Sequence, residues 1–516
     1  MPDPHAIDKY LYVERTPTWK VRALYAFGIV SWLLVLWGFG GAVRYDPFYR
    51  YFVGPILIVL TVYQLSSFIL NLFYRQFDLA GHLLWVKIFW IMRGRQSPVD
   101  VFLPICGEDV SILRNTWEHV ARLNYKNKRV YVLDDSTEDC AAHEALAVQF
   151  GFQYFARPNK GAMKKAGNLK YAFERTKGEF IVILDGDFAP HPDFLTETLP
   201  YMSDKKVGIV QTPQFFEMVK KSRKGYSIAY GSARVQEIFY RIIQVSRDRL
   251  GGAHCCGTCA LYRRTALSSI DGFVQMEHSE DAHTGFALAS RGWTVRYLPI
   301  TLAIGLCPDN VYALFHQQHR WCLGNVVLVL SKKFWTAPIS WTTKFCYLTG
   351  FIYNIHYPLI ILYSFQLFWT LFIYNDVISL NGAMIFYPYV AFTIFCLILP
   401  LSRLRLGCLS DYFIKTYSNA HALFSIVSKT SVGWIPTGAK HVDVSPAFKQ
   451  TMCAVGLYVA VYGSLLLFAA FLGYLHPFDL NYYSVQFWLF YNMALSMFLF
   501  WQMYAYYRKR KRVSAG

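Results

Sequence analysis

Long apolar runs gather towards the two ends of the chain. Runs at about 24–43 and 51–73 are each long enough to cross a hydrocarbon core of roughly 30 Å. Four more runs follow the middle of the chain, at about 345–374, 386–402, 450–474 and 485–507. Most of these runs reach about 20 residues without an ionised group, which fits poorly with buried helices of a soluble protein. We therefore expect two transmembrane helices before the middle of the chain and four after it.

The middle segment, about 95–335, alternates short apolar runs with helix-like spacing. The short runs predict strands at 99–105, 128–136 and 179–187. Apolar positions three and four residues apart predict helices at 112–123, 141–150, 168–176 and 281–292. This alternation is typical of an α/β domain with a mainly parallel sheet.

Three parts are therefore expected. Residues 1–94 would hold a tail and two transmembrane helices, 95–335 a cytosolic α/β domain, and 336–516 a second transmembrane region. The composition agrees, because 54% of the residues are hydrophobic and 16% are charged, against about 25% charged in ordinary soluble domains. The first apolar run follows a polar stretch of about 20 residues without a cleavage site, so it predicts a retained anchor and no signal peptide.

Basic residues are distributed unequally between the predicted loops. The loops at 375–384 and 475–481 hold no Lys or Arg, whereas the opposite side carries Arg403, Lys415 and the basic C-terminal end. The positive-inside rule therefore predicts a multi-pass protein of the cell membrane, with both termini and the middle segment in the cytosol. The formal net charge of +18 then indicates contact with membrane lipids and attraction of anionic substrates. No nucleic-acid motif is present, and nucleic acid is not expected as a partner.

Two of the predicted strands run into paired carboxylates, Asp134 with Asp135 and Asp185 with Asp187. Ligands of such sheets bind at the carboxyl ends of the strands. Carboxylates two positions apart can share a hard divalent cation with a substrate diphosphate. A single pair would fit an ordinary turn equally well, since Asp is common there. Two pairs, each after an apolar strand, favour a metal–diphosphate site.

Two further segments have both a structural and a chemical interpretation. Ser279 and Asp281 look like an ordinary helix start, in which an ionised carboxylate is favoured, but Asp281 is also a candidate catalytic residue. The sequence His-Cys-Cys-Gly-Thr-Cys at 254–259 lacks a second ligand pair at zinc spacing. A packed turn beside a substrate channel is the interpretation that we prefer for it.

The stretch at 316–325, His-Gln-Gln-His-Arg-Trp-Cys-Leu-Gly-Asn, places a guanidinium beside an indole shortly before an apolar run. Arg320 can offer a planar fork to phosphate oxygens, and Trp321 can stack on a sugar ring. The alternative is a cation–π pair that anchors a helix at a membrane surface. His316, Gln318 and His319 have no role in either interpretation.

Together, these motifs resemble the processive family-two glycosyltransferases, the group of cellulose, chitin and hyaluronan synthases. That family's order is Asp-Asp, Asp-x-Asp, Thr/Ser-Glu-Asp and Gln-x-x-Arg-Trp between transmembrane helices. This sequence reads Asp134-Asp135, Asp185-Gly186-Asp187, Ser279-Glu280-Asp281 and Gln317 to Trp321. Smaller matches resemble the cellulose synthase catalytic subunit, at 164–169, 211–216, 256–267 and 424–430.

The resemblance implies a GT-A-type α/β domain inserted between transmembrane helices, with interfacial amphipathic helices and a gating loop at about 424–442. It implies inverting, processive transfer from a UDP-sugar, with UDP-glucose favoured, to a growing β-glycan that crosses the membrane. Asp281 would be the catalytic base, and Asp185 and Asp187 would hold Mg²⁺ or Mn²⁺. The nucleotide-sugar would meet Glu108, Asp134, Asp135, Lys165, Asp185, Gln317, Arg320 and Lys429. The acceptor would meet Cys256, Gly257, Thr258, Glu280 and Trp321.

The sequence also departs from the cellulose synthase pattern. Val427 stands where the gating loop has Thr, and the segment at 433–441 matches nothing in that group. No cyclic-di-GMP-binding barrel is expected after the last helix. Hyaluronan, chitin, β-1,3-glucan and mixed-linkage glucan synthases therefore stay open, as does a non-processive lipid-linked glycosyltransferase. An accessory subunit and a homo-oligomer are open as well.

Overall fold

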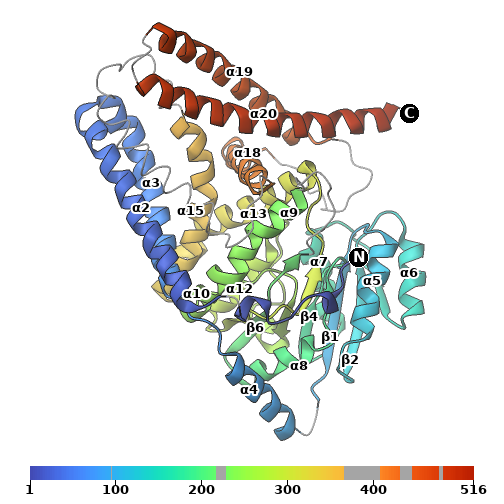
Figure 1. The fold of residues 1–516 in the computed structure, drawn as a ribbon. Coiled ribbons are helices and arrows are strands. Elements are labelled where there is room, and N and C mark those ends of the chain that lie inside the picture. The colour runs from blue at the N-terminus through green and yellow to red at the C-terminus, as the bar shows by residue number, and fades with distance from the viewer. Residues whose placement is uncertain are drawn as a thin grey trace.

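The computed structural model describes residues 1–14, 16–93, 96–216, 228–364, 407–430, 444–475 and 480–515. Its centre is a seven-stranded sheet in the order β3-β2-β1-β4-β8-β6-β9 (Figure 1). The strands are β1 (Val99–Ile105), β2 (Lys128–Asp134), β3 (Gln153–Ala156), β4 (Phe180–Ile183), β6 (Val207–Gln211), β8 (Ala260–Arg263) and β9 (Thr294–Tyr297). The strand β8 runs antiparallel to both neighbours, and the other pairs are parallel. The predicted α/β class is confirmed.

Parallel pairing brings the ends of the central strands to one edge of the sheet. In the β1–β2 pair Ile105 lies opposite Asp134, and in the β1–β4 pair Phe102 lies opposite Ile183. Helices packed around the sheet are α5 (Val110–Ala121), α6 (Cys140–Gln149), α7 (Lys164–Arg175) and α12 (Glu280–Ser290). The predicted helices match these within a few residues, and α7 begins four residues earlier than expected. The strand β2 ends at Asp134 and β4 ends at Ile183, so Asp135, Asp185 and Asp187 lie in the turns that follow.

A small second sheet lies next to the Asp185–Asp187 turn. It contains β5 (Ala189–Pro190), β10 (Ala303–Gly305) and β7 (Phe215–Phe216), with β10 in the middle. The ring of Phe188 lies so close to Gly305 that a Cβ there would be 2.5 Å from the ring. A side chain at 305 would therefore displace the residue that follows Asp187.

Four of the described helices are long and apolar enough to cross a membrane. They are α2 (Thr18–Tyr45), α3 (Gly54–Leu72), α15 (Trp341–Ser364) and α19 (Pro446–Leu475). They cover four of the six expected spans, and α2 and α3 pack side by side with α15 next to α3 (Figure 1). The span expected at 386–402 lies outside the described residues. The span expected at 485–507 lies within α20 (Leu480–Ala515), which is not among the four, so it stays a prediction.

The remaining helices connect the sheet to these spans. The helix α13 (Val311–Leu330) packs against α15 and α18 (Gly407–Ser428), and α9 (Ile228–Ile238) also packs against α18. Shorter helices are α1 (Leu11–Glu14), α4 (Leu79–Met92), α8 (Phe194–Thr198), α10 (Gln244–Arg249), α11 (Arg264–Ser268) and α14 (Lys332–Thr336).

Residues 1–14, here called the N-terminal strap, lie along the α/β domain. The carbonyl of Lys9 accepts the backbone N–H of Thr301 at 2.8 Å, and the amide of Asn115 donates to the Pro2 carbonyl at 2.9 Å. Just beyond the strap, the carbonyl of Thr16 accepts the hydroxyl of Tyr74 at 3.0 Å. The strap therefore connects the start of the first span to the sheet domain.

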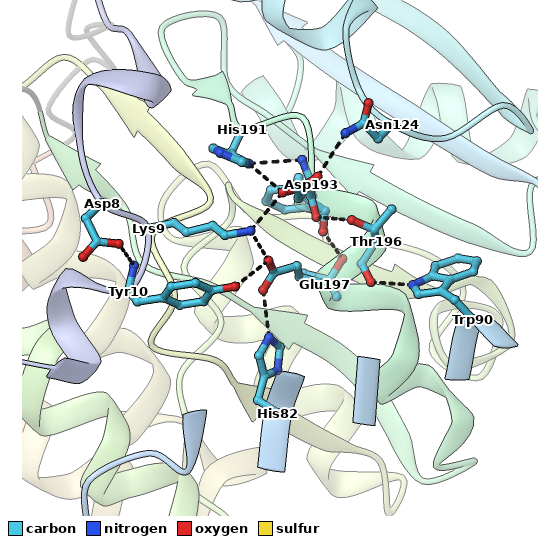
Figure 2. A network of polar contacts seen from close by, with 12 residues as sticks. Asp8, Lys9, Tyr10, His82, Trp90, Asn124, His191, Asp193, Thr196 and Glu197 are labelled. Atoms are coloured by element: carbon cyan, nitrogen blue, oxygen red, sulfur yellow. Dashed lines mark hydrogen bonds and ion pairs between the residues drawn. The ribbon is translucent and has the colours of Figure 1, made fainter. Parts of the chain in front are cut away.

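Figure 2 shows the polar contacts that hold the strap. The ammonium of Lys9 pairs with Asp193, at 2.9 Å, and with Glu197 in α8. Glu197 also accepts the Tyr10 hydroxyl at 3.0 Å and contacts His82 Nε2 of α4 at 2.7 Å. We call these five residues the Glu197 cluster. Burial would raise the pKa of Glu197, but the hydrogen bonds from His82 and Lys9 outweigh it and lower that pKa below its ordinary value.

Candidate active site

Asp134, the last residue of β2, is fully buried and bound by protein groups. Its carboxylate accepts the backbone N–H of Ser136 at 2.7 Å and the Tyr154 hydroxyl at 2.7 Å, and it lies 3.1 Å from His143 Nδ1. Burial would raise the pKa of Asp134, but these hydrogen bonds outweigh it and the pKa is lowered. Asp134 thus braces the end of β2, and its contact with a nucleotide stays a prediction.

Asp135 forms a bidentate ion pair with the buried guanidinium of Arg157. The two N–O distances are 2.8 and 2.7 Å, and the backbone N–H of Gly161 also donates to this carboxylate at 3.1 Å. Fork-to-fork pairs of this kind fix geometry as well as charge. The pair therefore fastens the loop before α7 over the end of β2. Sequence reasoning missed Arg157, because nothing near 157 marks it as the partner of a residue 22 positions away.

Lys165 joins the Asp-x-Asp turn to the segment at 256–258. Its ammonium pairs with Asp185 and donates to the Gly257 carbonyl at 3.2 Å. The backbone N–H of Asp185 donates to the Thr258 hydroxyl at 2.9 Å. Burial opposes the charge on Lys165, but Asp185 and Glu280 raise its pKa above the ordinary value. The structure thus brings predicted diphosphate-binding, metal-binding and acceptor-binding residues together.

Negative charge accumulates around Asp187. Burial, together with the charges of Asp185 and Glu108, raises the pKa of Asp187 to about 8. Burial likewise raises the pKa of Glu108, whose carboxylate accepts the Cys106 N–H at 2.5 Å. Carboxylates that repel one another in a partly buried turn suit a hard divalent cation, which takes oxygen ligands. Asp185 and Asp187 therefore fit the metal site that the sequence predicts.

Within the described ranges, no three His, Cys, Asp or Glu side chains form a ready-made metal site. Two carboxylates alone would leave ligand positions for the oxygens of a diphosphate, as Mg²⁺ usually requires.

Asp281 begins α12 beside the backbone of Gly257. Burial, and then the charge of Glu280, raises the pKa of Asp281 to about 7. Gly257 has φ +76°, and a Cβ there would lie 2.9 Å from Asp281 Oδ2, so this close approach requires glycine. Ser279 precedes α12 as expected, but its hydroxyl makes no capping bond and lies 3.5 Å from the Arg320 carbonyl. Asp281 thus combines a near-neutral pKa with contact to the predicted acceptor segment.

Two glutamines that received no role from the sequence hold the 256–258 segment. Gln211 accepts the Cys256 N–H at 2.8 Å and donates to the Thr258 carbonyl at 2.8 Å. Gln214 donates to the Cys256 carbonyl at 2.7 Å. Both belong to the 211–216 motif. The resemblance of that motif to the cellulose synthase pattern was the one feature of the sequence that could have pointed to these glutamines. Their amides fix the backbone that faces Lys165 and Asp281.

The helix α13 presents Gln317, Arg320 and Trp321 on the stripe that also contains Gly324. Gly324 lies against Ser279, too close for any side chain, and its carbonyl is 3.1 Å from His283 Nε2. Burial lowers the pKa of Arg320 to about 10, and the charge of Glu280 partly offsets this. α13 therefore packs against the turn that carries Glu280 and Asp281.

The predicted gating loop is only partly described. Residues 424–428 form the last turns of α18, and 431–443 lie outside the described residues. Lys429 is exposed, has φ 54°, and forms no ion pair with the part of the chain that the structure describes. The structure thus does not bring Lys429 to the acidic residues, and its contact with a nucleotide stays a prediction.

The fold and the acidic turns define a class of protein. Residues 100–271 match the family Glycosyl transferase family 2. A solved structure of the mannosyltransferase PcManGT from Pyrobaculum calidifontis, in complex with GDP-Man and Mn²⁺, superposes with a TM-score of 0.50 at 15% identity, over 72% of this chain and 100% of that one. The middle of the chain is thus similar to family 2 glycosyltransferases, and its fold is of the GT-A type.

More specific relatives are cellulose synthases. Cellulose synthase 1 of Komagataeibacter xylinus is 30% identical over 410 residues, which cover 77% of this chain and 26% of that protein. The cellulose synthase 1 catalytic subunit [UDP-forming] of the same organism is 28% identical over 408 residues, 77% of this chain and 53% of that one. The chain thus spans about a quarter to a half of these relatives. Over this length the chain is similar to cellulose synthases.

Proposed function

We propose that the chain is a membrane-embedded, processive, inverting glycosyltransferase that builds a β-glycan from a UDP-sugar and passes it across the membrane. A β-glucan made from UDP-glucose is the favoured product, because the relatives are cellulose synthases, one of them described as UDP-forming. The observation that carries the proposal is the meeting of Asp281, Gly257, Lys165 and Asp185 in one site.

Asp281 is the general base of the proposed transfer. With a pKa of about 7 it is substantially ionised at neutral pH and still basic enough to take a proton from a sugar hydroxyl. The hydroxyl of the acceptor would then attack the anomeric carbon of the donor from the side opposite the diphosphate. Gly257 leaves room for this approach, and Trp321 offers a flat face for the acceptor ring.

The diphosphate lies on the Lys165 side of the site in this proposal. Asp185 and Asp187 would hold Mg²⁺ or Mn²⁺, which when bound neutralises charge on the leaving diphosphate. Lys165 and Arg320 add positive charge from the protein, and Arg320 can bind two phosphate oxygens at once. Asp135 and Asp134 shape the nucleotide end through Arg157 and Tyr154.

The proposed topology places the strap and the α/β domain on the cytosolic side. The strap contacts the α/β domain, so the residues before α2 and that domain lie on one side of the membrane. The unequal distribution of Lys and Arg then favours the cytosol for that side. Residues 1–94, 95–335 and 336–516 would form the three parts, with the polymer leaving through the second transmembrane region.

The direct test is synthesis by the purified full chain in lipid nanodiscs. Separate incubations with UDP-glucose, UDP-GlcNAc and UDP-glucuronate, each with Mg²⁺ or Mn²⁺, are followed by linkage analysis of the product. A β-linked glucan is expected from UDP-glucose alone. A product from UDP-GlcNAc would assign a chitin-type or hyaluronan-type activity, and release of single sugars or of a lipid-linked sugar would reject processive synthesis.

Export is tested separately in sealed vesicles that have the α/β domain on the outside. Labelled polymer is expected inside the vesicles, protected from an added glucanase. Polymer that stays entirely on the donor side would reject translocation while leaving the transferase activity intact.

A further inference from the structure

Two histidines of α13 lie on the stripe next to the one that carries Arg320. His316 and His319 precede Arg320 by four residues and one residue, and both are buried. On a helix of 3.6 residues per turn, Gln317, Arg320 and Gly324 share one stripe, and the stripe of His316 and His319 lies on average about 100° around the helix from it. The first stripe faces the turn at Ser279, and the second faces α18 and the start of α19.

His316 contacts the start of α19. Its Nε2 lies 3.0 Å from the Ser445 hydroxyl, and that hydroxyl oxygen also accepts the Phe448 N–H at 3.2 Å. The Ser445 oxygen already accepts one hydrogen bond, which leaves its hydrogen available for His316. Burial, with the charge of Arg320, lowers the pKa of His316 to about 3, so the imidazole is neutral and can accept. His316 therefore ties α13 to the N-cap of α19.

His319 contacts α18 through a second imidazole. Its Nε2 lies 3.2 Å from His421 Nδ1, and His421 Nε2 lies 3.1 Å from Gln450 Oε1. The amide oxygen of Gln450 can only accept, so a neutral His421 donates from Nε2 and accepts at Nδ1. His319 must then donate from Nε2. One directed chain thus links α13, α18 and α19.

The surroundings of His319 keep its imidazole neutral. Burial is the largest cause that lowers the pKa of His319 to about 3, and the charge of Arg320 acts in the same direction. A neutral His319 donates its single N–H to His421. It therefore links two helices in a fixed orientation and has no further proton to donate.

We propose that His316 and His319 are positioning residues, which fix the rotation of α13 so that Arg320 and Trp321 face the Glu280–Asp281 turn. The proposal rests on the proposed function for the role of Arg320 and Trp321. Loss of either contact frees the histidine stripe of α13, and the neighbouring stripe with Arg320 moves with it because the helix turns as one body. These contacts give a function to residues that the sequence alone left without one.

The test compares His319→Phe with His319→Gln. Phenylalanine keeps the ring volume without a donor, whereas glutamine restores a donor nitrogen at nearly the same place. Polymer formation is expected to fall about tenfold in His319→Phe and less than about threefold in His319→Gln. His119→Phe, at a buried histidine of α5, is the matched control and should leave turnover within about twofold.

A double-mutant cycle with Arg320→Ala separates positioning from plain stability. If His319 acts through Arg320, then adding His319→Phe to Arg320→Ala costs much less than the tenfold loss seen alone. Full additivity, or a glutamine variant as weak as the phenylalanine variant, overturns the proposal.

Hydrogen–deuterium exchange gives a readout that does not depend on any activity. In His319→Phe, exchange is expected to rise in the amides at 279–282, which pack against the stripe with Arg320, as well as in α13 itself. A rise confined to α18 and α19 overturns the proposal. A wild-type chain that makes no polymer from any UDP-sugar would contradict the proposed function alone, because the exchange result would still decide the positioning role.

Discussion

Glu197 and Asp281 are both carboxylates held away from water, but their pKa values are shifted in opposite directions by the groups around them. Glu197 contacts the ammonium of Lys9, the hydroxyl of Tyr10 and the imidazole of His82, and its pKa is lowered. Asp281 lies against Gly257 and beside the carboxylate of Glu280, and its pKa is raised to about 7.

The difference separates a carboxylate that stabilises the fold from one that is suited to catalysis. A buried charge with matched partners holds segments together, and removal of one partner leaves an uncompensated charge. A buried carboxylate next to another carboxylate stays ready to take a proton or a cation. Lys9 and His82 come from segments before the α/β domain, so the Glu197 cluster joins distant parts of the chain, whereas Asp281 belongs to the proposed active site.

The largest effect is expected from Asp281→Asn. The amide cannot take a proton, so polymer formation should fall by roughly 10²–10⁴-fold, the usual worth of a general base. UDP binding, measured by calorimetry on the same protein in nanodiscs, should change less than about threefold. Loss of UDP binding together with activity would assign Asp281 to the donor site instead.

A smaller loss is expected from Asp187→Asn. Removal of one carboxylate from the Asp-x-Asp turn should raise the Mn²⁺ concentration needed for half-maximal polymer formation by at least about tenfold, because one oxygen ligand and one charge are lost. EDTA should abolish activity in wild type, and Mn²⁺ should restore it. Asp271→Asn, at an exposed ion pair with Lys170, is the control, and an equal effect there would contradict a metal role for Asp187.

The acid side of the pH profile should follow Asp281. Its pKa of about 7 lies above the ordinary value of 3.8, so the group loses its proton only as pH rises through about 7. Polymer formation should therefore increase about tenfold per pH unit below that point and level off above it. Glu280→Gln removes the neighbouring charge and should move the rise to lower pH. A profile unchanged by that substitution would remove Asp281 from the rate-limiting proton transfer.

The smallest effect on turnover is expected from Glu197→Gln. This substitution removes the carboxylate that joins Lys9, Tyr10 and His82 and leaves Lys9 paired with Asp193 alone, so the protein should lose about 3 kcal/mol of stability while turnover at 20 °C stays within about threefold. Thermal unfolding followed by fluorescence measures the loss. Tyr10→Phe removes one hydroxyl and should cost only about 1 kcal/mol.

The same cluster should respond to pH in the opposite sense to Asp281. The pKa of Glu197 is lower in the folded state than in the unfolded one, so its contribution to stability is present above the unfolded value of about 4.5 and is lost as pH falls through the folded pKa. The pKa of Asp281 is higher in the folded state, so that group stabilises the protein below pH 4 and the contribution is lost as pH rises towards 7. Wild type and Glu197→Gln should therefore differ little in stability at the lowest pH at which the fold survives.

Local patterns in the sequence predicted the elements that local forces decide. The strand at 99–105 coincides with β1, and the acidic pairs lie at or just beyond the ends of β2 and β4, at the predicted edge of the sheet. The apolar spans at both ends were visible because a bilayer selects long runs. The antiparallel strand β8 was not predicted, and neither were β5 and β7, since strands of two to four residues carry too little pattern.

Long-range pairing decided what the sequence could not show. Arg157 becomes the partner of Asp135 only when the loop between them folds, so the sequence does not reveal the pair. The strap could not be predicted either, because its residues have neither helical nor strand spacing. In the sequence Asp134 and Asp135 look equivalent. In the structure the carboxylate of Asp134 contacts Tyr154 and His143 in the protein interior. Which of two adjacent carboxylates meets a ligand depends on neighbours that are distant in sequence.

The strap also sets an order of events during synthesis. Lys9 emerges from the ribosome before the first span, yet its partner Glu197 lies 188 residues further along the chain. At about 5–20 residues per second, Lys9 must wait roughly 10–40 s for that partner. In the proposed topology, α2 and α3 enter the membrane during this wait, and the segment before them stays on the ribosome's side. In that topology the contact between Lys9 and Glu197 can form only if the first two helices were inserted in the right direction.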